Sequence, residues 1–337
     1  MKLRETEFYG LLLVVAAGLA WWSYHRPETP QKSEASDAIA LWAGSGELKG
    51  IRYERQRLTV NVEGAWAETT RQRPPRKAAA SADAGPAAEP EAAPEPEIRR
   101  FLINQKARDL LAALGGLEAK RNLGPVAKDR LEALGFGADQ GQLTLNFSKG
   151  ERSLLVGEKD VSGRLRYVKI VDQEPVYVID NRLMTDLEFA DSRLMEADLL
   201  PFDLAAVNAF TVESPWGGAQ RWTRSGKDFA QEGNDTIDPK ASTWITKFFR
   251  LKAMRYLAAE AKPGANAILA IQFETKEESG SLQLSREGEG KESEYRITAG
   301  GDSPMIKVSA WVAKDLEADV AELLPKAETT PPPQPTE

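Results

Sequence analysis

The chain has 337 residues, which is long enough for two domains of ordinary size. It is 42% hydrophobic and 28% charged, as in globular proteins, and its formal net charge of -7 disfavours nucleic acid as a partner. It contains no cysteine, which excludes disulfides, thiolate metal sites and cysteine nucleophiles. The one histidine, His25, directly follows an apolar run, which excludes histidine catalysis in a folded domain.

Close to the N-terminus, residues 8–24 form a run of 17 uncharged residues. At about 1.5 Å rise per residue, a helix of this length is at the short end of what spans a bilayer. We predict a transmembrane anchor at 8–24 after a cytoplasmic N-terminus at 1–7, with the rest of the chain across the membrane. The predicted anchoring residues are Phe8, Leu11, Leu12, Leu13, Trp21, Trp22 and Tyr24.

A cleaved signal peptide is the alternative interpretation of this run. Its apolar region would be residues 11–19, and the small residues around 18–20 would form the cleavage site. Trp21 and Trp22 extend the apolar run past that site, which favours the uncleaved anchor. A buried core helix is a third interpretation, which the polar stretch that follows disfavours.

Three stretches are biased in composition, and the second and third are predicted to be disordered. Residues 25–46 begin as a polar, proline-containing tether. Residues 73–97 are rich in Ala, Pro and Glu, and residues 325–337 form a similar tail. Such stretches cannot bury enough apolar surface to offset their ordering entropy.

The ordered parts of the chain resemble each other. The stretch PVYVIDNRLMTDL at 175–187 returns as PMIKVSAWVAKDL at 304–316. A helical pattern at 111–123 matches one at 245–257, and strand-like segments follow each in the same order. We therefore predict a tandem duplication, with a first repeat at 47–198 interrupted by the insertion 73–97, and a second repeat at 199–324.

Each predicted repeat consists of short strands, a helix, more strands and a final helix. Residues 51–56 and 58–64 alternate as in a hairpin, and 165–180 reads as a strand, a polar turn and a second strand that starts at Pro175. Asp180 or Asn181 can then cap the final helix. Strands joined by short turns pair in antiparallel fashion, so the predicted fold class is α+β, with helices packed on antiparallel sheets.

The search for chemical motifs predicts no catalytic, cofactor-binding or metal-binding residue. The glycine clusters at 44–50 and 135–141 lack the spacing and order of a nucleotide loop and are interpreted as turns. Acidic residues recur in two segments, and we interpret them as the solvated faces of helices. They are Asp186, Glu188, Asp191, Asp315, Glu317 and Asp319.

Eight tryptophans raise the question of a binding surface. Trp66, Trp244 and Trp311 fall in the repeated elements and are predicted to pack in the core. Trp216 and Trp222 lie beside two glycines and are the candidate contacts for a partner, with core packing as the other interpretation.

The segments LTLNF, GERSLLVGE, RYVKI and EPVYVIDNRLMTDL, followed by LLPFDLAAVNAFTVES, resemble a bacterial family of domains of unknown function, numbered forty-three forty. Its members are often encoded beside ABC-type transporters of the gliding kind. The resemblance implies a single-pass protein of the inner membrane, with most of its chain in the periplasm and with transporter or periplasmic proteins as partners. It brings no catalytic residue.

Three functions remain open at this point. The favoured one is a non-enzymatic, membrane-anchored accessory subunit of a transport system. The second is a module that binds peptidoglycan or another envelope polymer through Trp216 and Trp222. The third is a hydrolase with two carboxylates about 5–10 Å apart in a pocket.

Overall fold

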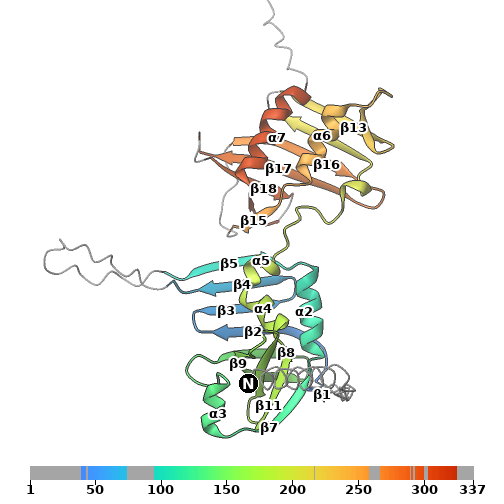
Figure 1. Cartoon of the computed structure of the whole chain (residues 1–337). Coiled ribbons are helices and arrows are strands. Elements are labelled where there is room, and N and C mark those ends of the chain that lie inside the picture. Colours follow the sequence, from blue (N-terminus) through green and yellow to red (C-terminus); the bar gives the residue numbers. More distant parts are fainter. Residues whose placement is uncertain are drawn as a thin grey trace, which may run out of the picture.

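The computed structural model describes residues 39–42, 45–73, 95–215, 217–257, 266–288, 290, 293–299 and 303–324. In these residues the chain forms two large antiparallel sheets that follow one another in sequence, each with its own helices (Figure 1). The predicted α+β class is therefore confirmed. The anchor predicted at 8–24 lies outside the described residues, and no helix within them is long and apolar enough to cross a membrane.

The first sheet has nine strands, and every neighbouring pair is antiparallel. In spatial order they are β5 (Glu97–Leu102), β4 (Trp66–Arg71), β3 (Leu58–Glu63), β2 (Leu48–Arg55), β8 (Gly141–Phe147), β9 (Gly150–Lys159), β10 (Leu165–Ile170), β11 (Pro175–Asp180) and β7 (Arg121–Pro125). Side chains alternate between buried and more exposed along β10, so one face of the sheet is the core face. A separate pair joins β1 (Ile39–Ala40) to β6 (Glu118–Ala119).

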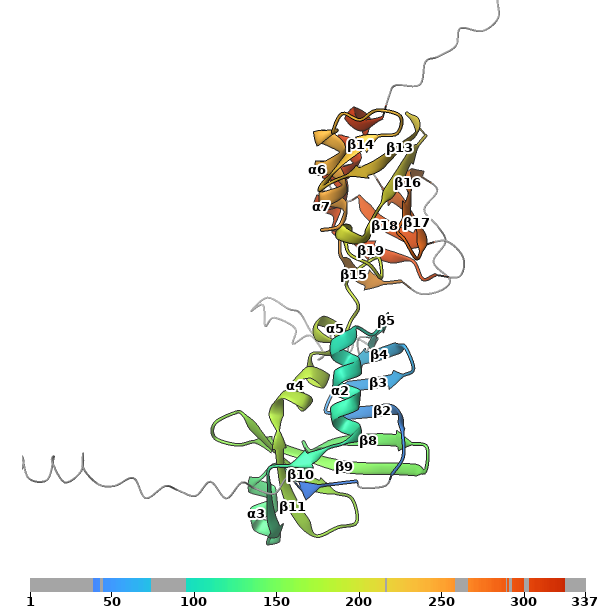
Figure 2. The ribbon, with the colours of Figure 1, turned by 90° about the vertical axis from the view of Figure 1, so that its right-hand side faces the viewer.

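Helices α2 (Gln105–Gly115) and α4 (Asn181–Glu188) lie on the same side of this sheet (Figure 2). Asn104 caps α2 by accepting a hydrogen bond from the Ala107 backbone N–H at 3.0 Å. Asp180, one of the two caps predicted from the sequence, caps α4 through the Arg182 N–H at 2.8 Å. Short helices α3 (Lys128–Ala133) and α5 (Ala190–Arg193) complete this half.

The second sheet has eight strands, again all antiparallel. In spatial order they are β14 (Asp228–Gln231), β13 (Gly218–Ser225), β12 (Ala209–Ser214), β16 (Asn266–Glu274), β17 (Ser279–Glu287), β18 (Glu294–Ala299), β19 (Ile306–Val308) and β15 (Ala253–Tyr256). Helices α6 (Pro239–Phe248) and α7 (Ala310–Leu323) lie side by side on one face of it (Figures 1 and 2). The short helix η1 (Leu204–Ala206) precedes β12.

The two sheets share one strand order. Without β5, the first sheet runs β4-β3-β2-β8-β9-β10-β11-β7, and the second runs β14-β13-β12-β16-β17-β18-β19-β15. Reading along the chain, each half has three strands that form one end of this order. Next in the chain is a helix, α2 or α6, and after it the strand at the opposite edge of the sheet, β7 or β15. Four more strands and a further helix, α4 or α7, complete each half. Strand β5 and helix α3 have no counterpart among the described residues of the second half.

The two helical patterns predicted at 111–123 and 245–257 are wrong in their extent. Helix α2 ends at Gly115 and α6 ends at Phe248, and each is followed by a short edge strand. Strand β7 pairs with β11, and β15 pairs with β19. In the second half Ala253 and Tyr256 of β15 continue the core, whereas Leu123 of β7 is exposed. In both halves, pairing with a distant strand outweighs the local helical pattern.

The halves meet along their edge strands. The Trp66 ring of β4 lies edge-on to the Tyr256 ring of β15, with 6.3 Å between centroids. The segment between the halves adds two hydrogen bonds: the Ala253 N–H donates to the Ala197 carbonyl at 2.8 Å, and the Tyr256 hydroxyl donates to the Glu196 carbonyl at 3.0 Å. One aromatic contact and two hydrogen bonds to the connecting segment therefore join the two sheets.

Candidate functional site

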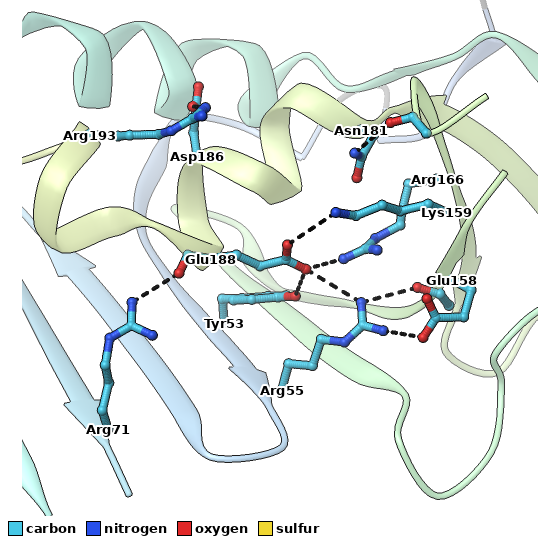
Figure 3. A network of polar contacts seen from close by, with 12 residues as sticks. Tyr53, Arg55, Arg71, Glu158, Lys159, Arg166, Asn181, Asp186, Glu188 and Arg193 are labelled. Atoms are coloured by element: carbon cyan, nitrogen blue, oxygen red, sulfur yellow. Dashed lines mark hydrogen bonds and ion pairs between the residues drawn. The ribbon is translucent and has the colours of Figure 1, made fainter. Parts of the chain in front are cut away.

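The most extensive polar cluster surrounds Glu188, at the C-terminal end of α4 (Figure 3). Its Oε1 accepts hydrogen bonds from Arg166 of β10, from the Tyr53 hydroxyl at 3.3 Å and from Arg55 at 3.5 Å. Lys159 lies 4.0 Å from the other carboxylate oxygen. The Glu188 carboxylate thus pairs with three basic side chains of the sheet beneath it.

The fold places these groups, apart from the 43% exposed Lys159, where water is largely excluded. Arg166 is 1% exposed although it is charged, because its position on β10 faces the core. The Nε of Arg166 has no hydrogen-bond partner among the described residues. Glu188, which pairs with the Arg166 guanidinium, supplies a counter-charge for it. Burial, and after it the Glu188 carboxylate, raises the pKa of Tyr53, which keeps the phenol protonated as a donor.

A more deeply buried carboxylate lies two residues earlier on the same helix. Asp186 accepts hydrogen bonds from Lys106 of α2 and from Arg193, both at 2.7 Å. Burial opposes its ionisation, but these two hydrogen bonds outweigh burial and lower the pKa of Asp186 below its ordinary value. The ion pairs tie α4 to α2 and to the end of α5.

The second half holds the same kind of cluster. Glu317 of α7 accepts hydrogen bonds from Arg286 at 2.7 Å and from the Tyr295 hydroxyl at 2.6 Å. Burial and the bond to Glu317 raise the pKa of Tyr295 to about 12. Glu188 and Glu317 each end an Asp-Leu-Glu triplet in the two matching stretches. In both halves a helix glutamate is therefore held by an arginine and a tyrosine of the sheet.

These observations correct the prediction of solvated helix faces for Asp186, Glu188 and Glu317, whereas Asp319 is 40% exposed. The sequence showed the helix spacing but not which elements cover the helix, so buried and exposed carboxylates could not be told apart. Asp186 is 4% exposed, and Asp191 pairs with Arg71 at 2.9 Å. The recurrence of Asp-Leu-Glu was the one signal in the sequence that could have identified Glu188 and Glu317.

The chemistry of the cluster is that of a structural clamp. The Glu188 carboxylate is occupied by hydrogen bonds from Tyr53, Arg55 and Arg166, which hold α4 against the sheet. Among the described residues no group of three or more His, Asp or Glu side chains could hold a metal ion.

The tryptophan positions divide between core and surface. Trp222 is 1% exposed, stacks on Phe210 with 5.1 Å between centroids, and donates to Asp238 at 3.0 Å. It therefore belongs to the core and offers no surface to a partner, while Trp216 lies outside the described residues. Trp244 is core as predicted and Trp66 is half-buried, but Trp311 is 76% exposed, so its predicted core position is wrong.

Comparison with known proteins gives one match. Residues 101–267 match a family described as a domain of unknown function, DUF4340. The matched segment contains α2, α4 and the Glu188 carboxylate, and it ends within β16 of the second sheet. The resemblance predicted from the sequence is therefore confirmed over this segment. No curated protein and no solved structure was found to match.

Proposed function

We propose that this member of the DUF4340 family is a non-enzymatic accessory or scaffold subunit, anchored in the bacterial inner membrane and associated with an ABC-type transport system of the gliding kind. In this proposal residues 8–24 form the anchor and both sheets lie in the periplasm. The main support for this proposal is the carboxylate that is held by basic groups in each half. The carboxylates of Glu188 and Glu317 form ion pairs that hold a helix against a sheet. This arrangement suits a rigid contact module better than an acid–base catalyst.

The proposal includes a duplicated origin for the two halves. The shared strand order and the recurring Asp-Leu-Glu triplet support one ancestral unit that was copied. Two like modules in tandem give a long surface for contacts with other proteins. The burial of Trp222 weighs against the alternative of an envelope-polymer site built from Trp216 and Trp222.

The partner is tested by affinity purification of the full chain from its native membranes in mild detergent. A tag at the C-terminus leaves the proposed anchor intact, and a tagged, unrelated single-pass protein of the same membrane serves as the control. We expect the subunits of an ABC-type transporter to be enriched with this chain over the control. Equal recovery with both baits would contradict the association.

The orientation is tested separately on spheroplasts. If the sheets are periplasmic, added protease must degrade the C-terminal tag before the cells are lysed, whereas a cytoplasmic marker protein stays intact. Degradation only after lysis would place the sheets in the cytoplasm. Labelling of the mature N-terminus in the same cells distinguishes the anchor from a cleaved signal peptide, since cleavage would remove Met1 to about residue 20.

A further inference from the structure

Residues 194–198 form the connector between the two halves (Figures 1 and 2). The Asn104 N–H, just after β5, donates to the Leu194 carbonyl at 2.9 Å. The Glu196 N–H donates in the opposite direction, to the Leu102 carbonyl at 2.7 Å. Two such bonds are the pattern of an antiparallel pair, so the start of the connector adds a short strand segment to the edge of the first sheet.

The Asn104 side chain strengthens this attachment. Its Nδ2 donates to the carbonyls of Arg193 and Met195, both at 3.1 Å. Leu194, which lies between these two residues, is fully buried in the core. The start of the connector is therefore held by hydrogen bonds and by core packing together.

The end of the connector is attached to the second half. Strand β15 donates two hydrogen bonds to it, one to the Glu196 carbonyl and one to the Ala197 carbonyl. Asp198, the last residue of the connector, forms an ion pair with Lys252. Every connector residue therefore bonds to one half or the other, and Glu196 bonds to both.

The residues that follow the connector enter the second core directly. The Phe202 ring lies edge-on to the Phe273 ring of β16, with 6.1 Å between centroids, and Leu199 and Leu200 also pack against the core. Residues 190–208 contain no glycine. Flexible linkers are rich in glycine and serine and lie where few contacts cross between domains. The connection between the halves has neither property.

We propose that the connector fixes the two halves at one angle, so that they form a single rigid body and not two modules on a hinge. Relative motion is the usual expectation for domains that share a small interface, and the contact of Trp66 with Tyr256 alone is small. A hinge needs a few residues whose backbone dihedral angles are free to change. Rotation within the connector would instead break at least one of its bonds.

A fixed angle has a consequence for recognition. A partner that contacts both halves meets them in one arrangement, so it does not have to offset the entropy of ordering two mobile modules. The inference concerns the chain by itself, and it holds whether or not a transporter is the partner.

Distance measurements between two spin labels by pulsed electron paramagnetic resonance test the proposal on the full chain in detergent. Because the chain has no cysteine, labels attach only at introduced ones. A113C in α2 and K314C in α7 place one label on an exposed helix position in each half. The control pair is Q283C with K314C, which lies within the second half. We expect a single distance peak between the halves, about as narrow as that of the control pair. A peak several times broader, or two peaks, would overturn the proposal.

Two variants test the role of the connector itself. Y256F removes the hydroxyl that donates to Glu196, and A253P removes the N–H that donates to Ala197 at the first residue of β15, where a strand tolerates proline. In the A253P/Y256F double variant we expect the distance peak between the halves to broaden at least about twofold, while the control pair is unchanged.

The single variant Y256F leaves the backbone unaltered and should broaden the same peak to a smaller extent. Its matched control is Y167F, which removes a tyrosine hydroxyl of β10 and should leave the peak unchanged. An unchanged peak in both Y256F and the double variant would contradict the role of the connector.

Discussion

Glu188 shows how a single charge can organise one half of this protein. Its carboxylate is 19% exposed and lies against Arg166, whose side chain is 1% exposed. A buried guanidinium with one principal counter-ion depends strongly on that ion, because removing it leaves a charge in a medium of low dielectric constant.

The E188Q variant tests this dependence. Glutamine keeps the shape of the side chain and removes its charge, so Arg166 loses its counter-charge. We expect the free energy of unfolding in urea to fall by about 3 kcal/mol. The matched control is E158Q, which removes a 54% exposed partner of Arg55 and should cost less than about 1 kcal/mol. Equal losses in both variants would contradict the clamp.

Asp186 makes stability depend on pH. Its pKa is lowered in the folded state, so its ion pairs contribute fully above the ordinary pKa of 3.8 and are lost as the pH falls through the folded value. We expect unaltered protein to be more stable than D186N at pH 7, and the difference to shrink on acidification below about pH 4. Urea unfolding at a series of pH values measures this difference, and a constant difference down to pH 3 would contradict the assignment.

The residues of the Glu188 cluster could not be predicted from the sequence. Tyr53 and Arg55 are more than 130 positions away from Glu188 along the chain, and only the pairing of β2, β8, β9 and β10 brings them together. Periodicity shows which residues share a helix face, but it does not show what covers that face.

At the scale of elements, local rules succeed where local groups decide the structure. Pro175 begins β11 and Asp180 caps α4, as the sequence predicts, because a missing N–H and a side-chain acceptor act within a few residues. The ends of α2 and α6 could not be predicted in the same way. They depend on the pairing of β7 and β15 with strands that lie 50 or more residues further along the chain.

The two N-cap aspartates should differ in their contributions to stability. Asp180 accepts one backbone hydrogen bond, so D180A should cost about 1 kcal/mol. Asp238 accepts hydrogen bonds from the Lys240 and Ala241 N–H groups and from the buried Trp222 indole. D238A should therefore cost about 2–3 kcal/mol, because an indole donor is also left unpaired. Urea unfolding of both variants gives the comparison, and an equal cost would contradict the role of the indole bond.

At the scale of the whole molecule, the contact of Trp66 with Tyr256 is the aromatic link between the halves. A double-mutant cycle with W66A and Y256A measures its strength. We expect a coupling of about 0.5–1.5 kcal/mol in the free energy of unfolding. A cycle of W66A with I297A, a core residue of the second sheet, should be additive. Additivity in both cycles would mean that the ring contact does not couple the halves.

The strand edges have a consequence for solubility. The edges of β5 and β15 face each other across the junction, so each half shields a row of backbone groups that could otherwise recruit another chain. The far edge of the first sheet is β7, where Pro125 lacks a donor and an irregular register with β11 twists the strand. Such an edge is a poor template for a foreign strand, which protects a molecule built from two open sheets against aggregation.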